Sequence, residues 1–331
     1  MPGPALPHPA LADPTPADRP QADRILTGVA LMLGFVVTAP LIDVFSKLAA
    51  ATLPVGQVTA ARFVVQGALM LPVALALGHG LGLPRALWPL VGLRALLLVL
   101  STYAFVSAID VMPLADALAI VYVMPFILLV LGRVLFGERV GRHRLGACVV
   151  GFGGCLLVIQ PSLAAFGAAA LWPLGTALAF AGYMVVTQRL GGRLDAVPMQ
   201  LHTSLAGAAL CLPVLWLADG SGVAALDPLW PEGRAWLWLA GTGAASAVAH
   251  LLMTLALRCA PSATLAPLNY LELVSAVVLG LLVFGDFPDA LTWAGIAVVV
   301  GSGLYVIARE RASAGRRRAT SRPGEASRAA G

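Results

Sequence analysis

The chain has 331 residues, of which 59% are hydrophobic and 11% charged, and its mean hydropathy is +0.89. An average soluble domain carries about 25% charged residues, so this composition excludes an ordinary cytosolic enzyme, a disordered chain and a nucleic-acid-binding domain. It indicates an all-α integral membrane protein embedded in the lipid bilayer. The net charge of +5 lies mostly in the two tails and does not point to an acidic partner.

Ten apolar segments, each close to the roughly 20 residues that span a bilayer, follow one another along the chain. Before them, residues 1–24 are rich in Pro, Ala and Asp and lack the features of a signal peptide. After them, residues 309–331 are basic and of low complexity, and both ends are predicted to be disordered tails. The predicted transmembrane helices are 25–48, 57–77, 86–108, 113–136, 144–160, 170–190, 199–217, 235–256, 262–284 and 290–308.

The basic residues predict how these helices cross the membrane. If the N-terminus is cytoplasmic, nearly all of the 21 Lys and Arg residues, Arg94 among them, fall on the cytoplasmic side. Arg234 is left on the opposite face, and Lys47, Arg62 and Arg133 lie within predicted spans. Because Lys and Arg concentrate in cytoplasmic loops, an even number of spans with both termini in the cytoplasm is expected.

The chain also repeats itself at a shift of 148 residues, which overlays 105–159 on 253–307. Each half, 25–160 and 170–308, then holds five predicted helices. Because five is odd, the second half must enter the membrane from the opposite side, which predicts two inverted five-helix repeats. The matching pairs include Pro113/Pro261, Tyr122/Tyr270, Gly132/Gly280, Phe136/Phe284 and Gly34/Gly182. Inverted repeats are typical of transporters that bind their cargo near the middle of the membrane.

The residues that carry these patterns resemble the EamA type of the drug/metabolite transporter superfamily. The most specific marks are the FGE and FGD triplets at 136–138 and 284–286, with LMLGFVVTAPLIDVFSKLAA at 31–50 and the closing SGLYVIARE at 302–310. The resemblance covers nearly all of 25–310 and implies ten helices in a bacterial inner (plasma) membrane. The branch is similar to uptake carriers for S-adenosylmethionine and riboflavin, but amino-acid exporters and nucleotide-sugar carriers also occur in the superfamily, so the cargo stays open.

Ionisable residues inside the predicted spans are candidates for function, because a charge at the bilayer centre costs roughly 2.5–3.5 kcal/mol on insertion scales. Asp43 and Lys47 share a helix face and form either a gate or a self-neutralising pair. Arg62 either binds an anionic group of the cargo or extends to the membrane surface. Asp116 takes part in coupling or is a carboxylate favoured at a helix start.

Glu272 is the sharpest candidate, near the middle of the ninth span and without an acidic counterpart, since Met124 occupies the equivalent position. It is interpreted as a proton carrier or a ligand for a cationic group, with an interhelical hydrogen bond as the alternative. His250 is a candidate contact for cargo or a proton; the depth of His202 is left open. Three tyrosines that could line a central cavity, or serve in packing, are Tyr103, Tyr122 and Tyr270.

We therefore expect a secondary transporter, not an enzyme, that moves a small polar or zwitterionic metabolite by alternating access, with proton coupling or exchange left open. A membrane-embedded enzyme or lipid-handling protein and a passive channel are the alternatives. The four cysteines form no C-x-x-C pair, and neither a metal nor a cofactor site is expected. Small residues at helical spacing suit close packing within the protomer or in a homodimer.

Overall fold

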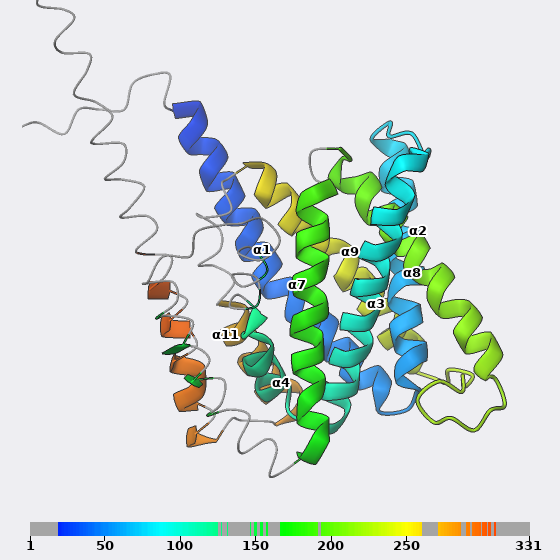
Figure 1. Cartoon of the computed structure of the whole chain (residues 1–331), viewed down its shortest axis with the longest axis vertical. Coiled ribbons are helices and arrows are strands. Elements are labelled where there is room, and N and C mark those ends of the chain that lie inside the picture. The colour runs from blue at the N-terminus through cyan, green and yellow to red at the C-terminus, as the bar shows by residue number, and fades with distance from the viewer. Residues whose placement is uncertain are drawn as a thin grey trace, which may run out of the picture.

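The computed structural model describes residues 19–124, 166–190, 193–259 and 271–285, most of 289–305, residue 308 and single residues between 127 and 157. The described elements are helical throughout (Figure 1). The α-helices are α1 (Arg19–Ala50), α2 (Val55–Ala76), α3 (Trp88–Val111), α4 (Leu114–Val121), α7 (Trp172–Leu190), α8 (Ala196–Ala218), α9 (Ala235–Cys259) and α11 (Leu271–Phe284). Short 3-10 helices precede α3 and α7, at Arg85–Leu87 and Gly167–Leu171.

Prolines and glycines set several of these helix boundaries. Pro54 and Pro113 come directly before α2 and α4, and Pro89 occupies the first turn of α3, where the missing N–H would have no partner in any case. Gly78, just after α2, has a φ of 70°, which a glycine adopts without a steric penalty. Local residues therefore encode the ends of these helices, whereas the apolar stretches between the ends determine which segments can span the membrane.

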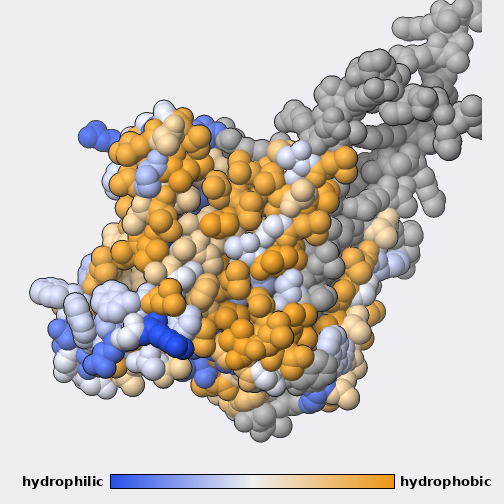
Figure 2. All heavy atoms as spheres, turned by 180° about the vertical axis from the view of Figure 1, so that it is seen from behind, coloured by the Kyte–Doolittle hydropathy of each residue, from blue (hydrophilic) through white to orange (hydrophobic). Residues whose placement is uncertain are grey.

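Six of the described helices are long and apolar enough to cross a membrane. They match the first three predicted spans and the sixth to eighth, with ends within a few residues of the prediction. The ninth and tenth predicted spans contain the shorter apolar helices Ser275–Phe284 and Trp293–Ser302. The fourth, 113–136, contains α4, which ends at Val121, and single helical positions after it. The fifth, 144–160, lies outside the described residues except for single positions. Apolar side chains cover most of the middle of the bundle on the face shown in Figure 2, and many large hydrophobic residues are exposed, as lipid contact requires.

The helix pairs are reciprocal between the two halves of the chain. The first helix of each half packs against the third helix of the other: α1 against α9, and α7 against α3 (Figure 1). The repeat partners Gly34 and Gly182 lie at these two crossings, where an added Cβ would come within 3.3 Å of Leu252 and of Leu97, respectively. The two glycines that the sequence aligns thus serve the same purpose, a close approach of two helices.

These contacts also fix the direction of each helix. Along α1, Gly34 lies beside Leu252 and Phe45 lies beside Gly241, so α1 and α9 run antiparallel. Equivalent contacts make α3 and α7 antiparallel, through the pairs Leu97/Gly182 and Tyr103/Trp172, and α2 and α8 antiparallel, through Phe63/Gly207 and Gly56/Leu215.

The helix α2 runs parallel to α9, since Val65 contacts Gly243, whereas Met70 and Ala74, further along α2, share an apolar cluster with Ala247 and Leu251. With α1 antiparallel to α9, and α2 parallel to it, the directions of α1, α2 and α9 are fixed relative to one another. Arg94 and Leu98 of α3 meet Thr203 and Cys211 of α8, so these two helices are parallel. It follows that α7, α8 and α9 each run opposite to their counterparts α1, α2 and α3.

Two ends of the bundle can be distinguished by these directions. We call the end where α1 finishes and α2 begins, at residues 51–54, the first end, and the end between α2 and α3, at residues 77–87, the second end. The loop 219–234 lies at the first end, where the Asp227 carboxylate accepts hydrogen bonds from the backbone N–H groups of Gly220 and Gly222. Trp216, Trp230 and Trp236 are exposed there, a placement typical of a membrane–water interface.

Candidate functional site

Arg62 of α2 points into the interior of the bundle. Its Nη1 donates a hydrogen bond of 2.7 Å to Thr102 Oγ1 on α3, and its guanidinium carbon lies 5.9 Å from the centre of the Phe63 ring. Its Nε is buried and has no hydrogen-bond partner among the described residues. A buried donor without a partner costs about 1–3 kcal/mol, so this guanidinium is incompletely satisfied by the protein itself.

Two carboxylates accompany this arginine. Asp43 of α1 lies within electrostatic range of both Arg62 and Glu272, the latter in the first described turn of α11. The three residues belong to different helices and to both halves of the chain. Opposite charges therefore meet in the interior, although no ion pair joins Asp43 to Arg62 within 4 Å in this structure. Such a set can bind an anionic and a cationic group at the same time.

A second polar group lies near the middle of α2 and α9. Gln66 is 1% exposed, and its Nε2 donates a hydrogen bond to His250 Nδ1, which is 3.3 Å away. Its Oε1 has no partner among the described residues, and neither does the Oγ of Ser246, one turn before His250 on α9. His250 thus lies in the interior as a partner of Gln66, and sequence reasoning had singled out only the histidine. The available signal was a glutamine one helical turn after Arg62, on the same face of an apolar helix.

Arg94 is the residue whose place the sequence analysis had wrong. Counted there among the cytoplasmic charges, it is 1% exposed and lies inside the bundle between α3, α7 and α8. Its Nε donates to Thr187 Oγ1 at 2.9 Å and its Nη2 to Tyr183 OH at 2.6 Å, while Nη1 donates to Met199 O and Thr203 Oγ1. A position two turns into a helix is compatible with both placements, and only the packing of α7 and α8 distinguishes them.

Lys47 lies toward the first end and does not pair with Asp43, although both residues are described and both lie on one face of α1. Its Nζ donates to the Met112 carbonyl at 3.3 Å and lies 4.6 Å from the centre of the Phe284 ring. Met112 follows α3 in the first half, and Phe284 ends α11 in the second. Lys47 therefore connects the two halves at the first end.

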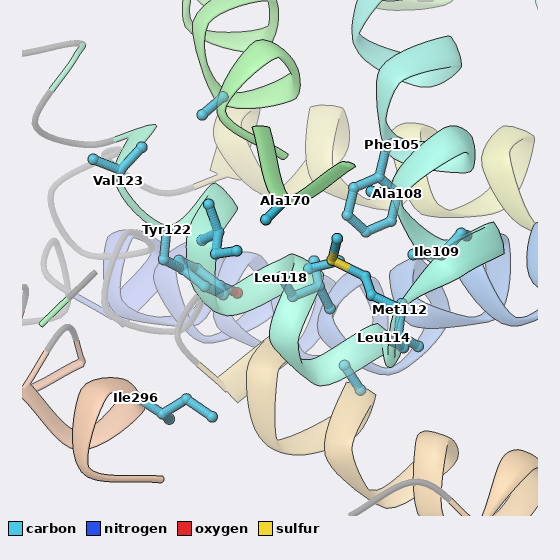
Figure 3. Packing of buried hydrophobic residues seen from close by; sticks show 14 of the residues in the cluster. Phe105, Ala108, Ile109, Met112, Leu114, Leu118, Tyr122, Val123, Ala170 and Ile296 are labelled. Carbon is cyan, nitrogen blue, oxygen red and sulfur yellow. The ribbon is translucent and has the colours of Figure 1, made fainter. Parts of the chain in front are cut away.

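The three candidate tyrosines do not lie in one common site within the described residues. Tyr103 packs with the apolar residues at the first end and makes an edge contact with Trp172, with 6.1 Å between ring centres. Tyr122 is 8% exposed and lies just after α4 in an apolar cluster that includes Leu118 and Ala170 (Figure 3). Tyr270 lies outside the described residues. The hydrogen bonds of Arg62 and Gln66 within the described residues go to Thr102 and His250 and not to Tyr103 or Tyr122.

The remaining candidates are Asp116 and His202. Asp116 lies in the first turn of α4, close to the first end, as a carboxylate favoured by the helix dipole does. His202 lies in the second turn of α8, near the second end, and its buried Nε2 has no hydrogen-bond partner in the described part of the chain. Within that part, no three His, Cys, Asp or Glu side chains come together as metal ligands would.

Comparisons with known proteins place this arrangement in context. The chain is 31% identical over 222 residues to a riboflavin transporter of Rhizobium johnstonii, covering 66% of this chain and 69% of the relative. It is 25% identical over 292 residues to an S-adenosylmethionine uptake transporter of Rickettsia prowazekii, covering 87% and 95%. A pseudopaline exporter of Pseudomonas aeruginosa is 26% identical over 275 residues, with 83% and 93% covered.

A solved structure shares the fold, with a TM-score of 0.61 and 20% sequence identity over 86% of this chain and 96% of the other. Two segments, 26–160 and 167–308, match the EamA-like transporter family. They correspond closely to the two halves inferred from the repeat. The expected resemblance is confirmed, and the protein is a multi-pass membrane transporter and not an enzyme. On these matches, the chain belongs to the EamA-like transporter family.

Proposed function

We propose that this transporter resides in a bacterial inner membrane, with ten transmembrane helices in two inverted five-helix repeats, 25–160 and 170–308, and both termini in the cytoplasm. The first end of the bundle then faces outward and the second end faces the cytoplasm. The opposite directions of α1, α2 and α3 and of their counterparts support this topology, as does the excess of basic residues at one side.

Its cargo, in this proposal, is a small metabolite with both an anionic and a cationic group. The observation that carries the proposal is the buried Nε of Arg62, which has no hydrogen-bond partner among the described residues, together with Asp43, which lies within electrostatic range of both Arg62 and Glu272. A carboxylate on the cargo would bind the guanidinium, and an ammonium group would bind one of the two acids. Two of the similar proteins are named for riboflavin and for S-adenosylmethionine. Of these two, S-adenosylmethionine carries an amino-acid group with both charges, so it is the first candidate.

Alternating access would move this cargo between the two ends. Lys47 supports a gate at the first end, because its contacts with Met112 and Phe284 join the two halves and must separate for the bundle to open there. Glu272 would bind the cationic group or carry a proton in exchange for it. Asp116, close to the same end, is retained as a candidate for coupling.

Counterflow in proteoliposomes tests the proposal. Vesicles loaded with unlabelled S-adenosylmethionine should accumulate the labelled compound transiently, whereas a passive channel would show no stimulation by internal cargo and an enzyme would alter the compound chemically. Riboflavin should be run in parallel as the second named candidate. The variant Arg62→Gln should abolish counterflow of S-adenosylmethionine, with Arg234→Gln, at an exposed position, as the control. Full counterflow by Arg62→Gln would exclude the proposed role of the guanidinium.

A further inference from the structure

We propose that Gln66, Ser246 and His250 form a second, uncharged subsite beside Arg62, which binds the neutral part of the cargo through hydrogen bonds to its N–H or O–H groups. The proposal rests on the proposed function and specifies its substrate class. Two of its members, Gln66 and Ser246, carry no charge, so the cost of placing a charge in the membrane does not mark them as it marks Arg62.

The polar atoms of this subsite are present but unused. Gln66 and Ser246 are 1% and 0% exposed, and the Oε1 of the former and the Oγ of the latter have no partner among the described residues. Nearly all buried polar groups in folded proteins are hydrogen-bonded, so two unpartnered ones on the packed helices α2 and α9 indicate a site for a polar group of the cargo. The same holds for Arg62 Nε one turn away.

The hydrogen bond between Gln66 and His250 fixes what the subsite offers. Because the Gln66 Nε2 donates to His250 Nδ1, the amide is oriented with its Oε1 turned away from the histidine and available as an acceptor. Ser246 adds a hydroxyl that can donate or accept. The part of the cargo that binds here is therefore a hydrogen-bond donor, such as an amide, a ring N–H, an exocyclic amine or a hydroxyl.

Helix geometry gives the spacing between the two subsites. Arg62 and Gln66 are four residues apart on α2, so they share a face and are separated by about 6 Å along the helix axis. Ser246 and His250 have the same spacing on α9, the helix that runs parallel to α2. The cargo should therefore carry its carboxylate and its neutral donor group about one helical turn apart, as in an amino acid or acid joined to a polar ring.

Three probes separate the two subsites in a thermal-shift assay on the purified full-length protein. Adenosine and riboflavin are neutral and rich in N–H and O–H donors, whereas methionine has the charged amino-acid group without a polar ring. We expect wild-type protein to be stabilised by methionine and by at least one neutral probe. Gln66→Met, which keeps the side-chain length but removes the amide, should weaken binding of the neutral probe at least tenfold and leave binding of methionine within about twofold.

The matched control is Gln57→Met, on the same helix at a half-buried position near its start, where the amide bonds to the backbone of Leu229. It should change neither binding constant. Arg62→Gln should show the reverse pattern, with loss of methionine binding and retention of the neutral probe.

The subsite is excluded if neither neutral probe stabilises the wild type, or if Gln66→Met binds it as the wild type does. Should Gln66→Met fail to fold, His250→Gln serves as a second variant, with loss of the neutral probe alone again the expected result. If instead Arg62→Gln retains methionine binding, the proposed function fails. The subsite then still depends on whether Gln66→Met loses binding of the neutral probe.

Discussion

Two arginines, Arg62 and Arg94, extend into the interior of the same bundle, but the protein treats them differently. Arg94 donates to three side chains and one carbonyl on α7 and α8, whereas Arg62 has one hydrogen bond, to Thr102, and a buried Nε without a partner among the described residues. A guanidinium with nearly all of its N–H groups hydrogen-bonded to other helices stabilises the packing of those helices. One that is left unsatisfied in the middle of a transporter is available to a ligand.

The largest expected effect is a loss of stability when Arg94 is replaced. Arg94→Met should destabilise the protein by about 3 kcal/mol, because Tyr183, Thr187 and Thr203 would lose their common partner inside the bundle. Arg62→Met should cost about 1 kcal/mol or less, since it leaves one hydroxyl group unpaired. Thermal unfolding of the two variants in the same detergent measures the difference. Equal losses of stability would remove the distinction between the two arginines.

For transport we expect the opposite order, with a larger effect of changes at Arg62 than of changes at Arg94. Arg62→Lys keeps the positive charge but loses the planar fork that binds a carboxylate through two hydrogen bonds, so we expect a KM at least tenfold higher with a nearly unchanged melting temperature. Arg234→Lys, in an exposed position, is the control and should transport as the wild type does. Concentration-dependent uptake into proteoliposomes gives both KM values, and an unchanged KM for Arg62→Lys would argue for a point-charge role only.

The partners of the two arginines provide a finer test. Thr102→Val should raise KM about threefold with only a small loss of stability, no larger than that of Arg62→Met, because it releases the Arg62 side chain from its position. Thr203→Val should do the reverse, with a loss of about 1 kcal/mol and a normal KM, since Thr203 bonds to Arg94. Uptake kinetics and thermal unfolding of both variants decide the matter. The same change in both variants would mean that the two clusters act as one.

The smallest effect is expected for Tyr183→Phe. The ring that lies 4.4 Å from the Arg94 guanidinium stays, and only the 2.6 Å hydrogen bond to the hydroxyl is lost. We expect a destabilisation of about 1 kcal/mol and unchanged transport. A raised KM in this variant would show that the α3–α7 contact takes part in the transport cycle and does more than stabilise the packing of the helices.

Sequence patterns predicted the helices well wherever the signal was local. The spans 25–48, 86–108 and 235–256 agree with α1, α3 and α9 because length and hydropathy of a membrane helix are properties of a continuous segment. The repeat in the sequence aligns Gly34 with Gly182, and the two glycines lie at equivalent helix crossings. The high cost of an intramembrane charge also pointed to Arg62 and His250, both of which face the interior.

The same local reasoning failed where partners come from distant segments. Spacing on one helix allows Asp43 and Lys47 to pair, yet Lys47 bonds to Met112 and contacts Phe284 instead. Hydropathy could not show that Arg94 turns inward. Only the packing of α2 beside α9 shows that Gln66 and Ser246 are buried with polar atoms that have no partner among the described residues.

The sequence by itself thus determined that this protein is a transporter built from repeated apolar helices, and which charges are too costly to face lipid. Hydrophobicity and helix periodicity act within single segments and can be followed along the chain. The tertiary structure alone decided which of those polar groups are already satisfied and which still have hydrogen bonds to offer. That outcome depends on neighbours contributed by other helices, because each buried N–H or C=O is paired or left free by whatever packs against it.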